Sequence, residues 1–151
     1  MKQTKVVLFT DTFCDINGVS RFLQDIAGIA QNRSLCFYII TSSVKPCPQM
    51  ENVYIIKPKF KTKIPFYPEL HLVFPSYNKL KSIVDEICPD VIHISTPGFV
   101  GMMGKRIARK RSLPMIGVYH TDFPKFAYKN MPFKIVKYLA DRYMQYFYRD
   151  F

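Results

Sequence analysis

Residues 15–20 (DINGVS) hold a pattern that could bind an anion. Asn17 and Gly18 precede an amphipathic run that predicts a helix, and the free N–H groups at a helix start favour a phosphate. Gly18 has no side chain to block the approach of such a group. Alternatively, Gly18 only makes a tight turn and Asn17 or Asp15 only caps the helix. The spacing does not separate these two interpretations.

His120 directly follows a strand-like run and is followed by Thr121 and Asp122. A lone histidine in this position is more often a hydrogen-bonded structural residue, but its polar neighbours favour a ligand site. Asp11 follows another strand-like run. It could form a carboxylate pair with Asp122 across a cleft, or it could order its loop by accepting backbone N–H bonds.

Motifs for metals and dinucleotides are missing from the sequence. Neither GxGxxG nor GxxxxGK[ST] occurs, and the histidines show no spacing typical of metal ligands. No two of the cysteines at positions 14, 36, 47 and 88 have CxxC spacing, which disfavours a zinc knuckle and a thioredoxin motif. We therefore expect no metal site and no cofactor.

The cysteines and the apolar runs also give information on the cellular compartment of the protein. Four cysteines could form two disulfides, but no other feature suggests secretion. The apolar run at residues 6–10 is too short for a signal peptide, and no run approaches the roughly 18 residues of a transmembrane helix. We expect a cytoplasmic protein with reduced thiols.

The composition indicates a folded domain with a cationic surface. The chain has 151 residues, of which 48% are hydrophobic, and this excludes intrinsic disorder. Lys and Arg number 22 against 11 Asp and Glu, which gives a net charge of +11. Such an excess implies an anionic partner, such as nucleic acid, a phosphorylated substrate or a membrane surface.

Strand-like and helix-like segments alternate along the chain. Strands are predicted at residues 5–10, 35–41, 53–56, 91–95 and 114–119. Helices are predicted at residues 19–30, with Phe22 in the apolar stripe that faces the sheet, and at 77–87 (capped by Ser76), 99–111 and 132–148. The proline-rich residues 57–75 predict an irregular excursion with a short edge strand. This order is typical of an α/β fold, a Rossmann-like doubly wound and mostly parallel sheet.

The ends of the predicted strands define where a ligand should bind. In open α/β sheets, ligands bind at the carboxyl ends of the strands. Residues 10–20, 95–101 and 119–124 should therefore meet at one edge. The predicted last helix ends almost at residue 151, where such a sheet normally continues with another strand. We therefore expect the chain to be cut short.

Three motifs resemble the N-terminal half of the retaining glycosyltransferases of family 4, which have the GT-B fold. They are TDTFCDINGVSR (10–21), PDVIHISTPGFVG (89–101) and LPMIGVYHTDFPKF (113–126), and their order and placement match over nearly the whole chain. The STPG and YHTDFP forms and KIPFYPELHL (63–72) are similar to the bacterial and plastid branch that glycosylates lipids such as diacylglycerol or phosphatidylinositol.

The resemblance implies roles for residues on the donor side. Gly18 would approach the diphosphate of a nucleotide-sugar donor, and Asn17, Val19 and Ser20 would shape that loop. His120 matches the family's catalytic histidine, which hydrogen-bonds the donor sugar near the reacting centre. A diphosphate leaving group is stabilised by helix-start N–H groups and cations, and GT-B enzymes need no bound metal for this.

The resemblance also implies an acceptor side of the cleft. Thr96, Pro97 and Gly98 would line it, and Thr121 and Asp122 would order or contact the site. Arg21 and the region of Tyr67 are further candidates for contact with the acceptor. The full set of acceptor and cleft candidates is Asp11, Arg21, Tyr67, Thr96, Pro97, Gly98, Thr121 and Asp122.

The family's second Rossmann-like domain, which binds most of the nucleotide sugar, has no counterpart in this sequence. We expect residues 1–151 to be a GT-B N-terminal domain, separated by truncation or a split gene from a C-terminal domain or partner chain. Alone it should be inactive, because the donor would lack its main contacts and a dry site. The complete enzyme should be a hexosyltransferase that acts with retention on a lipid or glycan acceptor, a membrane glycolipid being expected.

Basic residues cluster at 57–63, 105–111 and 125–149, and the last cluster is rich in aromatic residues. Such helices can lie on anionic membranes, which predicts a peripheral place on the inner membrane face. Alternatively, this is a solvated basic face with its aromatics packed on the sheet or on the missing domain. A second class of function is a non-catalytic α/β module that binds an anionic ligand or nucleic acid. No RRM, KH, helix-turn-helix or zinc-finger pattern occurs, so we expect no nucleic acid partner.

Overall fold

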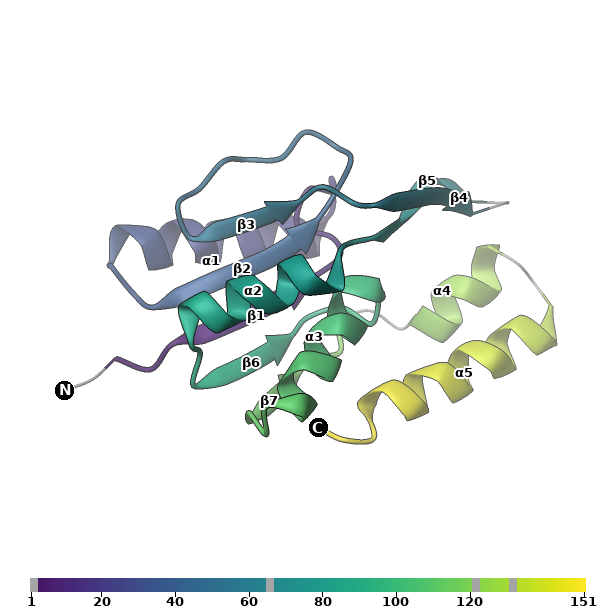
Figure 1. Ribbon diagram of the computed structural model, residues 1–151. Coiled ribbons are helices and arrows are strands. Elements are labelled where there is room, and N and C mark those ends of the chain that lie inside the picture. The colour runs from purple at the N-terminus through teal and green to yellow at the C-terminus, as the bar shows by residue number, and fades with distance from the viewer. Residues whose placement is uncertain (1–2, 65–66, 121–122, 131–132) are drawn as a thin grey trace.

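Parallel strands form the central sheet of the computed structural model, which describes residues 3–64, 67–120, 123–130 and 133–151 (Figure 1). The strands are β1 (Val6–Thr10), β2 (Phe37–Ser42), β3 (Val53–Ile56), β6 (Val91–Ile94) and β7 (Met115–Gly117). Their order across the sheet is β3-β2-β1-β6-β7, and every neighbouring pair is parallel. The prediction of a Rossmann-like α/β sheet, as in one half of a GT-B enzyme, is confirmed.

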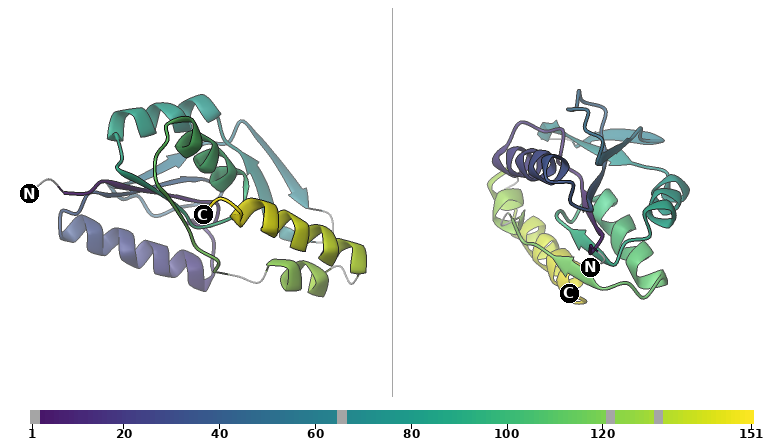
Figure 2. Two further views of the ribbon diagram at one scale, coloured as in Figure 1. Left: turned by 90° about the horizontal axis from the view of Figure 1, so that it is seen from below. Right: turned by 90° about the vertical axis from the view of Figure 1, so that its left-hand side faces the viewer.

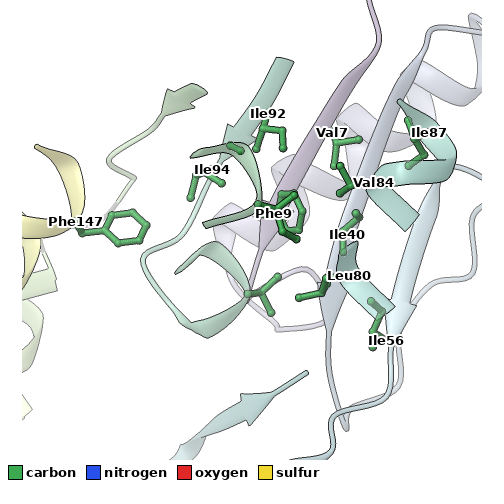
Figure 3. Packing of buried hydrophobic residues seen from close by; sticks show 13 residues of the cluster. Val7, Phe9, Ile40, Ile56, Leu80, Val84, Ile87, Ile92, Ile94 and Phe147 are labelled. Atoms are coloured by element: carbon green, nitrogen blue, oxygen red, sulfur yellow. The ribbon is translucent and has the colours of Figure 1, made fainter. Parts of the chain in front are cut away.

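Helices cover both faces of the sheet, so its central strand is buried on both sides (Figure 2). Alternate residues of β1 enter two separate clusters. Leu8 packs with α1 (Gly18–Asn32), whereas Phe9 packs with α2 (Tyr77–Ile87) and α3 (Phe99–Lys110). Figure 3 shows the second cluster around Phe9. This two-sided burial explains the unbroken apolar run of β1, because neither face of the strand meets water.

The proline-rich excursion contains a β-hairpin. Strands β4 (Phe60–Ile64) and β5 (Tyr67–Phe74) pair antiparallel as a separate two-stranded sheet, so the expectation of an irregular segment with one short edge strand is wrong. Pro58 and Pro75 lie outside the two strands, where they break no ladder. The rings of Phe60 and Phe74 pair across the strands at 5.8 Å.

The C-terminal region forms two helices where the sequence predicts a loop and one long helix. They are α4 (Phe123–Asn130) and α5 (Lys134–Tyr148), and they run alongside each other (Figure 1). Pro124 lies in the first turn of α4, a position that tolerates proline because its N–H would be unpaired anyway. The buried residues of α5 are Ala140, Met144 and Phe147, so the helix is anchored from its middle to its end.

Two local expectations are also wrong. Ser76 occupies the N-cap position of α2, but its side chain makes no capping hydrogen bond. Phe22 of α1 is 52% exposed, although its spacing places it in the apolar stripe.

Among the residues that the structure describes, no helix is both long enough and apolar enough to cross a bilayer.

A disulfide joins Cys14 to Cys47, so the expectation of four reduced thiols is wrong for this pair. Cys14 lies in the loop after β1 and Cys47 in the loop after β2, two loops that the parallel sheet places side by side. Cys36 and Cys88 are free thiols. The bond closes a ring with a sequence separation of 33, which removes conformational freedom from the unfolded chain.

We predict that alkylation of the denatured, unreduced chain modifies Cys36 and Cys88 alone, as read by mass spectrometry. The double variant Cys14→Ser/Cys47→Ser should lose about 2–4 kcal/mol of unfolding free energy in urea titration, because the unfolded chain is no longer cross-linked. Cys88→Ser, at an exposed free thiol, is the control. Alkylation of all four cysteines before reduction would contradict the bond.

Candidate functional site

The loops after β1, β6 and β7 come together at the carboxyl edge of the sheet, as expected from the strand order. Asp11, directly after β1, contacts the loop and helix that follow β6. His120, three residues after β7, has its ring beside Phe22 of α1, with centroids 6.3 Å apart. One edge of the sheet therefore carries both Asp11 and His120.

The Asp11 carboxylate joins the end of β1 to the start of α3. It accepts hydrogen bonds from Thr96 Oγ1 at 2.7 Å, from Val100 N at 2.8 Å and from Gly101 N at 3.3 Å. The Asp11 N–H donates in return to Thr96 Oγ1 at 2.7 Å. Asp11 thus orders its loop by accepting hydrogen bonds from the start of α3, which is one of the two arrangements considered for it.

Burial raises the pKa of the Asp11 carboxyl, and the hydrogen bonds from Thr96, Val100, Gly101 and Gly98 oppose that rise. The Asp11 carboxylate also caps α3, because the N-cap residue of this helix is Gly98, which has no side chain. A Cβ added at Gly98 would overlap the Asp11 carboxyl group. Glycine is therefore required there for Asp11 to reach the helix.

We predict that Gly98→Ala lowers the free energy of unfolding by about 1–3 kcal/mol, because the added methyl group displaces the Asp11 carboxylate. The matched control is Gly28→Ala within α1, where the new Cβ would meet Met50 Cε at an ordinary 3.5 Å. Alanine in a helix interior should stabilise by about 0.5–1 kcal/mol relative to glycine. Urea unfolding measures both variants, and destabilisation of equal size in the two would contradict the steric argument.

The start of α1 has a capped and buried side and an open side. Asn17 is the N-cap, and its side chain accepts from Ser20 N at 2.8 Å. Ser20 is buried and donates to the Phe13 carbonyl at 2.6 Å, so its hydroxyl holds the loop in place. A Cβ built at Gly18 has no other atom within 4 Å, so space is open in front of the helix. Val19 packs partly against the α1 cluster.

A pocket of about 300 Å³ lies beside this helix start, lined by Cys14, Asp15, Ile16, Asn17, Arg21, Gln24, Pro46 and Pro48. The disulfide and a 2.6 Å ion pair between Lys45 and Asp15 join the two loops that form it. The Arg21 side chain is 81% exposed and pairs loosely with Asp25 at 3.6 Å, so its guanidinium remains accessible to an anion. The pocket thus places a cation and open helix N–H groups together.

His120 is exposed at the carboxyl edge, and partial burial lowers its pKa. His93 of β6 also has a lowered pKa, first because of burial and then because of the charge on His120. Both imidazoles are therefore neutral at pH 7. Among the described residues, no group of three or more His, Cys, Asp or Glu side chains could hold a metal ion.

Three of the predicted site residues cannot be placed as side chains. Thr121 and Asp122 lie outside the described residues, so the arrangement of Asp11 with Asp122 is not addressed. Tyr67 is the first residue of β5, on the hairpin.

Sequence reasoning missed two tyrosines of α5 that hold the site loops. The Tyr143 hydroxyl donates to the Pro97 carbonyl, and the Tyr148 hydroxyl donates to the Val118 carbonyl at 2.7 Å. Burial, with smaller effects from the charges of Asp11 and Tyr148, raises the pKa of Tyr143 to about 12. Both hydroxyls therefore stay protonated as donors at neutral pH.

The basic cluster at residues 105–111 is largely used inside the fold. Lys105 is 7% exposed and binds Asp150 at 3.0 Å and the Phe147 carbonyl. Arg109 also pairs with Asp150, and Arg111 pairs with Asp85. These contacts join α3 to the end of α5, so they offer little charge to an external anion.

The chain was compared with known proteins. The family described as Glycosyltransferase Family 4 matches residues 16–151. The chain is 26% identical over 144 residues to an alpha-monoglucosyldiacylglycerol synthase of Streptococcus pneumoniae, a match that covers 90% of this chain and 32% of the relative. It is 36% identical over 58 residues to a GDP-mannose-dependent alpha-mannosyltransferase of Mycobacterium tuberculosis, covering 38% of this chain and 15% of the relative.

The chain thus spans about a third of the length of the first relative and less of the second. The family match extends from the loop before α1 to the end of α5, and it includes the α1 start, the Thr96–Gly98 turn and His120. The sheet order and the placement of these loops at its carboxyl edge agree with that match. The chain belongs to glycosyltransferase family 4 and has the α/β fold of one half of a GT-B enzyme.

Proposed function

We propose that the protein containing this chain transfers a hexosyl group from a nucleotide sugar to a lipid acceptor with retention of configuration. This chain would be its acceptor-side domain, and a second domain or chain would bind most of the donor. Family membership supports the sugar transfer. The name of the streptococcal relative supports a diacylglycerol-type acceptor, and that of the mycobacterial relative supports a nucleotide-sugar donor.

The observation that carries the proposal is the open start of α1. Nothing lies within 4 Å of a Cβ built at Gly18, while Asn17 caps the helix from its other side. Unpaired N–H groups and the exposed Arg21 guanidinium therefore face free space beside the pocket. A diphosphate that gains negative charge as it leaves the sugar would be stabilised by these groups without a metal ion.

His120, whose ring lies beside Phe22 of α1, would act on the sugar at the same edge of the sheet. Because its pKa is lowered, the neutral imidazole offers one N–H donor to a sugar hydroxyl near the reacting carbon. Thr96 and Gly98 would serve indirectly, since they hold Asp11 and the start of α3 in place. The chain's own contribution is thus to orient the donor and to stabilise charge.

We predict that Gly18→Val abolishes detectable donor binding and that His120→Ala lowers kcat by about 10²-fold or more in the full-length gene product. Both variants should fold like the wild type, because residue 18 faces open space and His120 is exposed. Transfer from radiolabelled nucleotide sugars, with circular dichroism as the folding check, measures this. Near-wild-type turnover in both variants would refute the site assignment.

For the acceptor, we propose that α5 lies on an anionic membrane surface. Its outward side chains are apolar and aromatic as well as basic, and they are exposed: Phe133, Lys134, Ile135, Lys137, Tyr138, Leu139, Arg142, Tyr146 and Arg149. Apolar side chains at such a helix face enter the headgroup region, and each nearby Lys or Arg adds about 1 kcal/mol on anionic lipid. A peripheral position of this kind would bring the cleft close to a lipid acceptor.

We predict that the chain sediments with vesicles of phosphatidylcholine and phosphatidylglycerol, and much less with phosphatidylcholine alone. Ile135→Ser/Leu139→Ser should reduce sedimentation several-fold, because both removed side chains are exposed on α5. Ile29→Ser, which removes an apolar side chain that is 52% exposed on α1, is the control. Equal sedimentation with and without anionic lipid would overturn the membrane proposal.

A further inference from the structure

His120 follows a weakly supported strand. β7 is only three residues long, is paired on one side only, and none of its residues is fully buried. One further backbone bond, from Val118 N to the Ile94 carbonyl at 3.1 Å, continues the pairing after its end. A histidine that must meet a substrate atom needs a more exactly fixed backbone than such an edge provides.

The end of α5 supplies additional support to the three residues before His120. Phe151 packs on Gly117, where an added Cβ would come within 2.7 Å of its ring. The Tyr148 hydroxyl donates to the Val118 carbonyl at 2.7 Å. The Tyr148 ring also meets the Tyr119 ring edge-on, with centroids 5.5 Å apart.

This support is itself firmly anchored. The Lys105 ammonium binds both the Phe147 carbonyl and the Asp150 carboxylate, and Arg109 binds Asp150 as well. Its hydrogen bond to Lys105 lowers the pKa of Asp150, so the carboxylate stays charged at neutral pH. Phe147 is only 2% exposed, and Figure 3 shows its ring on the side of the cluster where Ile94 lies. The last turn of α5 is therefore fixed to α3.

We infer that Tyr148 is a positioning residue for His120. Its hydroxyl fixes the Val118 carbonyl, and with it the direction in which the chain enters His120, so that the imidazole stays against Phe22 and faces the edge of the sheet. What His120 does there rests on the proposed function. That Tyr148 fixes its orientation does not.

The test is Tyr148→Phe, which keeps the ring and its packing and removes only the hydroxyl. The control is Tyr128→Phe, at a tyrosine that is 38% exposed on α4. NMR of this chain follows the His120 imidazole through a pH titration. In Tyr148→Phe the His120 pKa should rise towards 6.5, because a loosened imidazole is better hydrated, and the Phe22 ring contact should weaken.

His93 of β6 is the titratable neighbour whose pKa senses the charge on His120, and its titration is followed as well. Burial raises the pKa of Tyr148, so its hydroxyl is neutral throughout the range of that titration. In the full-length gene product, Tyr148→Phe should lower kcat about tenfold or more with donor KM nearly unchanged, because the reacting geometry and not the binding is lost. Tyr128→Phe should match the wild type in all of these measurements.

Unchanged His120 chemical shifts and pKa in Tyr148→Phe would overturn the positioning role, whatever the activity. A shifted His120 together with full turnover in His120→Ala would keep the positioning role and reject the proposed catalytic one. A fall in kcat with unperturbed His120 signals would also overturn the inference, since Tyr148 would then act by another route.

Discussion

The site depends on one carboxylate that connects two strands of the sheet. Asp11 ends β1 and accepts hydrogen bonds from the turn and the helix start that follow β6, so the two loops cannot move independently. Such charge-assisted hydrogen bonds are stronger than neutral ones, and they satisfy N–H groups that α3 leaves unpaired. The absence of a side chain at Gly98 is the steric condition for this arrangement. The first role of Asp11 at this edge is therefore to hold the two loops together.

A second set of contacts, made by α5, also holds the loops after β6 and β7. Lys105 and Arg109 of α3 hold the end of α5, and the tyrosines of α5 hold the Pro97 and Val118 carbonyls. Asp11 fixes the beginning of α3, so one helix relates all three loops to each other. Some of the basic residues that the composition suggested for an external anion are used in these internal contacts, whereas Lys134, Lys137 and Arg142 are exposed on α5.

The parallel sheet could be predicted from the sequence, because a strand buried on both faces, such as β1, is an unbroken run of apolar residues. The Asn17 cap could also be predicted from the sequence, because its hydrogen bond joins two residues that are close in sequence. Lys105 and Asp150 are far apart in sequence, and no periodicity marks two residues that meet only after folding. Phe22 fits the apolar period of α1, but it is half exposed and its ring lies beside His120, a contact that no local pattern marks. The Cys14–Cys47 pair was missed for the same long-range reason.

The disulfide has a consequence for how the open start of α1 meets a ligand. It closes a covalent ring that contains the whole of α1 and the whole of β2, so fraying of the helix cannot move Gly18 far from the sheet. The entropy lost in ordering that loop is therefore largely lost during oxidative folding, before any ligand arrives. Because the loop at the start of α1 is ordered in advance, it loses less entropy on binding a ligand than a loop held only by hydrogen bonds would.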